Sequence, residues 1–345
     1  MRDIFVHPAG QDDNLGDSAL RAGLIAALRG DGHRLHVYLE AQSGDYLSGI
    51  PTSSTDVAYS TRRAWVSAAR TTRRPVYVVN AGEVSPKPGQ RYPHARRAAE
   101  MRATLGRDGI VIAAGLGLKD PALGPQLQFD DVLRHASIMS WRDGGSRDAA
   151  RFGEIAPDWA FALGSDLKQW ALADEREFIA VTLRFDRPWP SSVWFGEVRA
   201  LAAESGRRIV TLAQVARDAP RAVALAEELG GTYLVAPSTM HNDLDRHVRS
   251  IYARALAVVS DRAHALIMGA TEGAYPIGTA VDPQKIQRLL AAVGLDALTG
   301  SHDNLGGRAT QLTRVAPTLT SAIGAARRDL ARLADNIQST LIDSV

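Results

Sequence analysis

The chain has 345 residues, 45% hydrophobic and 23% charged, which is typical of a soluble globular protein large enough for two domains. The lack of cysteine excludes disulfides, a thiolate nucleophile and cysteine-ligated zinc, and it fits a cytoplasmic location. The 40 lysines and arginines nearly balance 38 acidic residues, so a net charge of +2 gives no indication of a nucleic-acid partner.

The first half of the chain alternates short apolar runs with amphipathic segments. The apolar runs predict strands over 4–6, 35–39, 76–79, 110–114 and 138–141. Helical spacing predicts helices over 19–28, 96–104 and 131–135. Because these strands are apolar throughout, the pattern favours a parallel sheet that is covered on both faces.

The pattern loses its period over 157–177 and then restarts, so we expect a hinge near 165–174. Strands are predicted over 178–183, 209–212, 233–235, 257–259 and 275–278, with helices over 193–203, 221–229 and 263–269. A last helix carries one apolar face, formed by Ile323, Ala326, Leu330, Leu333, Ile337 and Leu341. We expect this face to pack on the fold.

These patterns predict an α/β protein with two Rossmann-like, doubly wound domains that face a cleft. The expected N-terminal domain covers residues 1–165 and forms the acceptor side and part of the donor site. The expected C-terminal domain covers residues 175–320 and forms the donor side. The amphipathic helix covers residues 321–345. In such sheets, ligands bind beyond the carboxyl ends of the strands, so the loops at those ends are the places to seek function.

The loop after the first strand contains several turn and capping residues. Gly16 permits a tight turn, and Asp17 or Ser18 would cap a helix that begins at Ala19. Asn14 would then point into the cleft. The loop is neither a Walker A motif nor a G-x-G-x-x-G fingerprint, so it does not indicate a tightly bound nucleotide.

Three predicted strands are followed closely by arginines, Arg142, Arg184 and Arg262. Planar guanidinium groups at strand ends suit a small ligand that carries both a phosphate and a carboxylate. Arg262 also precedes His264 at a predicted helix start, where backbone N–H groups favour an anion and the imidazole can carry a proton. The alternatives are solvated arginines, a helix cap at Asp261 and a core histidine.

Taken together, these segments resemble the polysaccharide pyruvyltransferase family. The resemblance is carried by Asn14-Leu15-Gly16-Asp17, Ser140-Trp141-Arg142-Asp143 with Ser146, Pro157-Asp158, and Ser260-Asp261-Arg262-Ala263-His264-Ala265 followed by Pro276 and Lys285. It implies two Rossmann domains of the glycosyltransferase B type. It also implies transfer of a pyruvyl group from phosphoenolpyruvate to a sugar, as a ketal.

The resemblance assigns roles to particular residues. The positions associated with donor binding and catalysis are Arg142, Arg262 and His264. The positions expected near the active site are Asn14, Asp17 and Lys285. The chemistry requires a general acid, for which His264 is suited, and a carboxylate such as Asp17 or Glu83 to take the proton of a sugar hydroxyl.

The chain departs from the family pattern at two places. Ala263 stands where a leucine is usual, and 80–83 has the sequence Asn-Ala-Gly-Glu where a glycine run is frequent. The second departure places polar side chains where backbone alone is expected. It therefore keeps open a catalytically silent sugar-binding protein on the same fold. Among enzymes, the alternative is a nucleotide-sugar-dependent glycosyltransferase that uses the same cleft.

We therefore expect a cytoplasmic, phosphoenolpyruvate-dependent pyruvyltransferase in cell-wall or exopolysaccharide synthesis, acting on a saccharide or a lipid-linked saccharide. The expected catalytic residues are His264, Arg262 and Asp17. The expected substrate-binding residues are Arg142, Asn14, Arg184, Lys285 and Glu83. We expect no metal, no cofactor besides phosphoenolpyruvate as donor, no nucleic-acid partner and at most peripheral contact with a membrane.

Overall fold

The computed structural model describes residues 2–39, 42–302 and 308–343. The chain forms two compact units, each built around a parallel sheet. Unit 1 comprises Met1–Asp12, Leu20–Trp159 and Asp329–Val345, and unit 2 comprises Asp13–Ala19 and Ala160–Arg328. Helices α1 (Leu15–Leu28) and α13 (Leu319–Asp343) therefore each contribute residues to both units.

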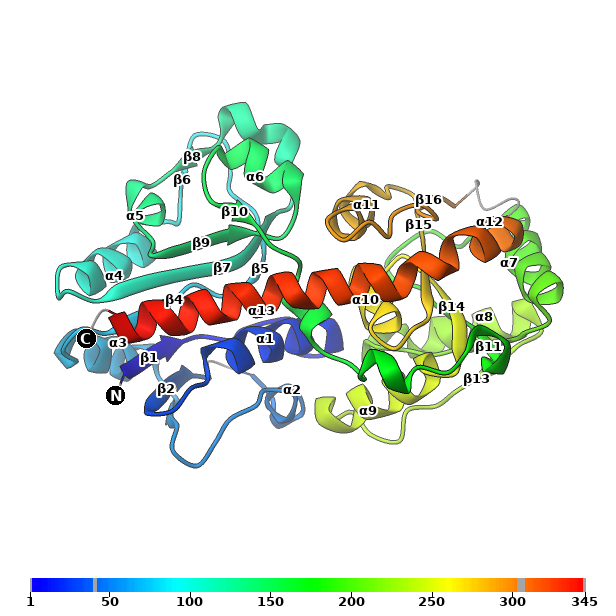
Figure 1. Ribbon diagram of the computed structural model, residues 1–345, viewed down its shortest axis with the longest axis horizontal. Coiled ribbons are helices and arrows are strands. Elements are labelled where there is room, and N and C mark those ends of the chain that lie inside the picture. The colour runs from blue at the N-terminus through cyan, green and yellow to red at the C-terminus, as the bar shows by residue number, and fades with distance from the viewer. Residues whose placement is uncertain (1, 40–41, 303–307, 344–345) are drawn as a thin grey trace. The chain divides into compact units, whose positions relative to one another are not determined.

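The sheet of unit 1 has the strand order β10-β9-β7-β4-β1-β2-β3, with β5 paired to β7 (Figure 1). Its strands are β1 (Arg2–Val6), β2 (His33–Tyr38), β3 (Val57–Tyr59), β4 (Val76–Val78), β5 (Gly82–Val84), β7 (Ile110–Leu118), β9 (Ile138–Trp141) and β10 (Glu154–Ile155). A separate pair joins β6 (Arg91–Tyr92) to β8 (Gln128–Phe129). The order reverses between β1 and β4, as in Rossmann folds.

Short helices cover this sheet, and large aromatic side chains fill the space beneath them. The helices are α2 (Gly44–Ser48), α3 (Arg62–Thr71), α4 (Ala95–Leu105), α5 (Asp131–Arg134) and α6 (Gly144–Ala150). Trp65 of α3 packs against Phe5 and Tyr77 from the strands, and all three rings are almost fully buried. Burial of this aromatic area stabilises the unit together with the aliphatic core around it.

Unit 2 contains the strand order β13-β12-β11-β14-β15-β16. The strands are β11 (Phe178–Thr182), β12 (Arg208–Thr211), β13 (Thr232–Tyr233), β14 (Ala255–Ser260), β15 (Tyr275–Ala280) and β16 (Gly300–Ser301). The helices are α7 (Ser192–Ser205), α8 (Ala219–Leu229), α9 (His241–Tyr252), α10 (Ala263–Ala270), α11 (Gln284–Ala291) and α12 (Arg308–Val315). In chain order this is 3-2-1-4-5-6, so the order reverses between β11 and β14.

The structure confirms the expected fold class. Each predicted strand falls on a strand of one of the two sheets, and every strand pair within these sheets is parallel. The strands that were not predicted, such as β5 and β10, have only two or three residues, too few to show a period. The predicted start of the first helix at Ala19 is wrong, because α1 begins at Leu15, where the Asn14 side chain accepts a hydrogen bond from the backbone N–H of Gly16 at 3.1 Å.

The buried Arg176, just before β11, binds several backbone carbonyl groups in the core of unit 2. Its Nη1 donates to the carbonyl oxygens of Tyr252 at 3.5 Å, Ala255 at 2.9 Å and Glu272 at 3.2 Å. A side chain at Gly273 would clash with the guanidinium, since a Cβ there would lie 2.2 Å from Nη2. This guanidinium therefore binds carbonyl groups at the end of α9, at the start of β14 and just after α10.

We predict that Arg176→Lys lowers the free energy of unfolding of unit 2 by about 3 kcal/mol, because an ammonium group cannot reach this set of buried carbonyl oxygens. Urea unfolding followed by tryptophan fluorescence measures the change. Arg208→Lys is the matched control, since the Arg208 side chain is 74% exposed and pairs with the exposed Glu177. Equal stability of the two variants would contradict the assigned role of Arg176.

Candidate active site

The carboxyl ends of β11 and β14 are joined by side chains of the late sequence motif. Ser260 Oγ donates to the carbonyl oxygen of Thr182 at 2.6 Å and accepts from the backbone N–H of Arg262 at 2.9 Å. Asp261 Oδ1 accepts from the backbone N–H of Arg184 at 2.8 Å. The motif therefore fixes the two strand ends at the point where the strand order reverses, where Rossmann folds bind ligands.

Arg262 is held by a buried ion pair with Asp218. Its Nε and Nη2 donate to the two carboxylate oxygens, with an Nη2–Oδ1 distance of 2.9 Å. Asp218 is fully buried and also accepts from the backbone N–H of Phe185 at 2.9 Å. Because a buried carboxylate is stable only when it is paired, the guanidinium is fixed in position with its Nη1 edge directed away from Asp218.

Asp261 titrates nearer neutral pH than an ordinary aspartate. Burial raises the pKa of its carboxyl to about 6, and the nearby carboxylate of Asp218 acts in the same direction. The Arg184 backbone N–H and the charges of Arg262 and Arg184 lower that pKa, without compensating the burial. Its Oδ2 is buried and has no hydrogen-bond partner among the described residues.

The N-terminal motif packs directly on His264, the second residue of α10. A Cβ at Gly16 would lie 2.4 Å from the Cβ of His264 and 2.6 Å from its Nδ1, so only glycine fits there. Asn14 forms a backbone bridge to Val215, and Asp17 follows in the first turn of α1. The N-terminal ends of α1 and α10 thus meet at one imidazole, and both helix dipoles favour negative charge there.

Residues 13–19 are held against the rest of unit 2 by two side-chain contacts. Arg217 forms a bidentate ion pair with Asp13, at 2.6 and 3.0 Å. Ser18 Oγ lies 2.7 Å from Nδ1 of His241 and donates to the carbonyl oxygen of Leu15 at 3.0 Å. Since the hydroxyl has one proton, the imidazole is assigned as donor to Oγ. His241 is the first residue of α9 and is buried.

Unit 1 contains a second arginine that is held by a buried aspartate. Arg142 follows β9 and is 3% exposed, and its Nη1 donates to Oδ2 of the fully buried Asp158 at 3.0 Å. A Cβ at Gly117 would lie 2.3 Å from the Arg142 Nε, so the side chain lies against the backbone of β7. The alternative of a solvated surface arginine is therefore wrong for Arg142.

The remaining predicted residues are less closely grouped. The Arg184 guanidinium pairs with the carboxylate of Asp186 at 2.8 and 2.7 Å, which lowers the pKa of Asp186 to about 2. Lys285 is exposed on α11, and Glu83 is exposed on β5 of unit 1. The structure thus brings Arg262 and His264 together with the segment that contains Asn14 and Asp17, all within unit 2.

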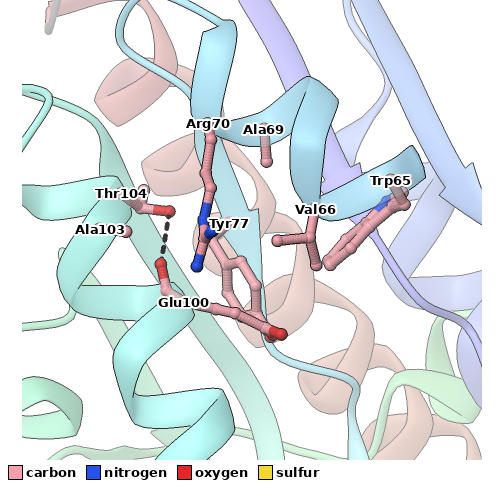
Figure 2. A pocket seen from close by; sticks show the side chains of 8 residues that line it. All are labelled: Trp65, Val66, Ala69, Arg70, Tyr77, Glu100, Ala103 and Thr104. Carbon is pink, nitrogen blue, oxygen red and sulfur yellow. Dashed lines mark hydrogen bonds between the residues drawn. The ribbon is translucent and has the colours of Figure 1, made fainter. Parts of the chain in front are cut away.

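Two hollows contain none of the predicted site residues. Figure 2 shows the side chains that line one of them, which come from α3, α4 and β4. Its volume is about 10 Å³, room for about one water molecule. There the Tyr77 hydroxyl donates to Glu100 at 3.1 Å, and burial raises the pKa of Tyr77 far above its ordinary value. The other, of about 600 Å³, is lined by the C-terminal end of α7 and by α12. We assign neither to the reaction.

Across residues 2–39, 42–302 and 308–343, no group of three or more histidine, aspartate or glutamate side chains is placed to hold a metal ion. Over these ranges, none of the helices has the length and apolar character needed to cross a membrane.

Comparison with known families identifies the chain. The profile of the family described as polysaccharide pyruvyl transferase matches residues 14–283, well over half of the sequence. The chain belongs to the polysaccharide pyruvyl transferase family. The match begins at Asn14 and includes Arg142, Arg262 and His264. No curated protein sequence matches the chain.

Solved structures share the fold at low sequence identity. Anabaena HepE in complex with UDP has a TM-score of 0.54 at 10% identity, with 99% of each chain covered. A putative UDP-N-acetylglucosamine 2-epimerase from Listeria monocytogenes has a TM-score of 0.53 at 13% identity. S. aureus MnaA with UDP has a TM-score of 0.51 at 12% identity. Each of these two matches covers 99% of this chain and 97% of the other protein's chain. These likenesses confirm the glycosyltransferase B type of fold.

We predict that Asp261→Asn removes a pH-dependent loss of stability. A carboxyl whose pKa rises from about 3.9 unfolded to about 6 folded binds more protons in the native state, so stability falls as pH rises through this window. Between pH 4.5 and 7.5, the free energy of unfolding of the variant should increase relative to that of the parent, by at most about 3 kcal/mol. Thermal or urea unfolding across this range measures the difference, and a pH-independent difference would contradict the raised pKa.

Proposed function

We propose that this family member transfers a pyruvyl group from phosphoenolpyruvate to two hydroxyls of a saccharide, forming a ketal and releasing phosphate. The observation that carries the proposal is the junction in unit 2, where Gly16 packs on His264 beside the fixed guanidinium of Arg262. These groups come from distant parts of the sequence and lie at the point where the strand order reverses. The family match supports the reaction class.

The chemistry of the donor matches this junction. Phosphoenolpyruvate carries a phosphate and a carboxylate, and a guanidinium with one edge held by Asp218 can present its other edge to either anion. The dipoles at the N-terminal ends of α10 and α1 have the same sign and favour an anion at this junction. We propose that Arg142 also binds the donor, as the family resemblance implies.

In the proposed reaction, His264 delivers a proton to the methylene carbon of the donor, which becomes a methyl group. The neighbouring carbon becomes cationic and forms a bond to the oxygen of a sugar hydroxyl, and its bond to the phosphate oxygen breaks. A second hydroxyl then closes the ketal ring. The two sugar hydroxyls together lose two protons. One is balanced by the proton that the methylene carbon gains, and the other is taken by the released phosphate.

A carboxylate is needed to accept a hydroxyl proton. Asp17 is suited to this role, because it lies in the first turn of α1, directly after the glycine that packs on His264. Glu83 on β5 of unit 1 is the other candidate. Arg184 and Lys285 keep their proposed roles in substrate binding, although the Arg184 guanidinium also pairs with Asp186.

The main alternative is a glycosyltransferase that uses a nucleotide sugar. HepE and MnaA were each solved with UDP, but identities of 10% and 12% extend only the fold to this chain. A thermal shift assay distinguishes the two proposals. Phosphoenolpyruvate should protect the protein from unfolding, and protection by UDP alone would favour the alternative.

We predict phosphate release that requires both phosphoenolpyruvate and a saccharide acceptor, and a loss of about 10²- to 10⁴-fold in kcat for His264→Ala with little change in the KM for the donor. A general acid acts chiefly in the transition state, which is why kcat carries the effect. His135→Ala is the control, since His135 is exposed in unit 1. Turnover of His264→Ala within a few-fold of the parent would return His264 to a packing role.

We also predict that Asp218→Asn raises the KM for phosphoenolpyruvate about tenfold to a hundredfold, because the guanidinium of Arg262 loses the charge that fixes it. Steady-state kinetics at several donor concentrations measures this, with unfolding recorded in parallel. Glu177→Gln is the matched control, since Glu177 pairs with Arg254 and Arg208 at the surface. A destabilised variant with an unchanged donor KM would show that Asp218 has a structural role alone.

A further inference from the structure

The loop that follows β11 exposes two aromatic side chains. Phe185 is 44% exposed and Trp189 is 47% exposed, and none of the other large hydrophobic residues exposed in the described part of the chain is aromatic. Both belong to the segment 183–190, between β11 and α7. Aromatic rings left in water lose the free energy that burial would supply, so two in one loop call for an explanation.

This loop is firmly held. The backbone N–H of Phe185 is bound by Asp218, the residue that fixes Arg262. The Arg221 Nη1 donates to the carbonyl oxygen of Arg184 and to the carbonyl oxygen of Arg187, at 2.7 Å from Arg187. The Arg221 Nη2 donates to the carbonyl oxygen of Pro188 at 2.9 Å. The aromatic side chains are therefore displayed by an ordered backbone, beside the end of the strand that borders the proposed donor site.

Each aromatic ring lies against a guanidinium. The Arg217 guanidinium carbon is 5.1 Å from the Phe185 ring centroid, and that of Arg221 is 5.3 Å from the Trp189 centroid. The Trp189 ring also contacts Phe195, with centroids 5.5 Å apart. These contacts orient both rings while leaving almost half of each side chain accessible.

The charges around the rings are largely paired. Arg217 is bound by the Asp13 carboxylate, Arg184 by that of Asp186, and Arg221 by carbonyl oxygens. Besides these three arginines, the loop carries the exposed Arg187, so a strongly anionic ligand would find few free cations here. A neutral ligand with an apolar face and several hydroxyls would find both an aromatic surface and planar polar groups.

We infer that Phe185 and Trp189 form a binding surface for the acceptor saccharide, on which the C–H face of a sugar ring stacks while its hydroxyls reach the neighbouring arginine and aspartate groups. This assignment of the acceptor surface rests on the proposed transfer to a saccharide. The surface lies at the carboxyl end of β11, and Asp218 connects its backbone to the Arg262 guanidinium. On this inference, the sugar binds at the same edge of the unit 2 sheet as the proposed donor.

The test has a binding arm without donor and a kinetic arm with it. Methyl glycosides of glucose, galactose, mannose and N-acetylglucosamine serve as probes, and saturation-transfer NMR reports binding to the free protein. Phe185→Leu and Trp189→Leu remove the rings and keep apolar volume, whereas Phe185→Tyr and Trp189→Phe keep a ring. Leu172→Ala is the control, since Leu172 is an exposed aliphatic residue of unit 2.

We expect the leucine variants to bind the glycosides at least tenfold more weakly, and the ring-retaining variants and Leu172→Ala to bind like the parent. In the kinetic arm, the KM for acceptor should rise by the same factor while the KM for phosphoenolpyruvate stays unchanged. Ring-dependent glycoside binding without pyruvyl transfer would refute the proposed reaction but support the saccharide-binding surface. Absence of binding to the parent, binding that survives loss of both rings, or ring-dependent binding of UDP in place of a glycoside would overturn the inference.

Discussion

The ion pair between Arg262 and Asp218 is the constraint on which the rest of the site depends. Asp218 has no exposure to solvent, so its charge is stable there only while the guanidinium faces it. The same carboxylate binds the backbone N–H of Phe185 and thereby orders the loop after β11. One buried charge therefore determines both the direction of the proposed donor-binding arginine and the position of the proposed acceptor surface.

Unit 1 repeats this arrangement independently. Arg142 is held by the fully buried Asp158 and lies on the backbone at Gly117, where no side chain would fit. Pairs of this kind contribute little net stability, because desolvation of both charges offsets their attraction. Their value in a transferase is geometric, since an arginine with one edge held loses less conformational freedom when an anion binds.

Much of the fold could be predicted from the sequence because the strands of both sheets are apolar throughout and separated by helical spacing. The chemistry of the late motif was also visible locally, since Arg262 and His264 stand at a strand-to-helix junction. Asp218 was missed because it is 44 positions from Arg262 in the sequence, and only the tertiary fold pairs the two. A lone aspartate before a helix has no feature that distinguishes it from an ordinary turn residue.

The position of the N-terminal motif was likewise beyond local reasoning. Residues 13–19 follow the first strand of unit 1, yet they pack with unit 2, because Gly16 admits His264 and Asp13 pairs with Arg217. The exposed aromatic pair of the loop after β11 was also not foreseen, since apolar residues between two strong elements read as part of the core. Exposure is a property of the folded chain, so the sequence alone does not predict it.

The most direct test of the account is a crystal structure of the protein soaked with phosphoenolpyruvate. The account predicts a phosphate or carboxylate oxygen of the donor at hydrogen-bonding distance from the Arg262 guanidinium, with the methylene carbon next to the His264 imidazole. Donor bound elsewhere on the molecule, or an Arg262 that turns away from Asp218 when the donor is present, would contradict it.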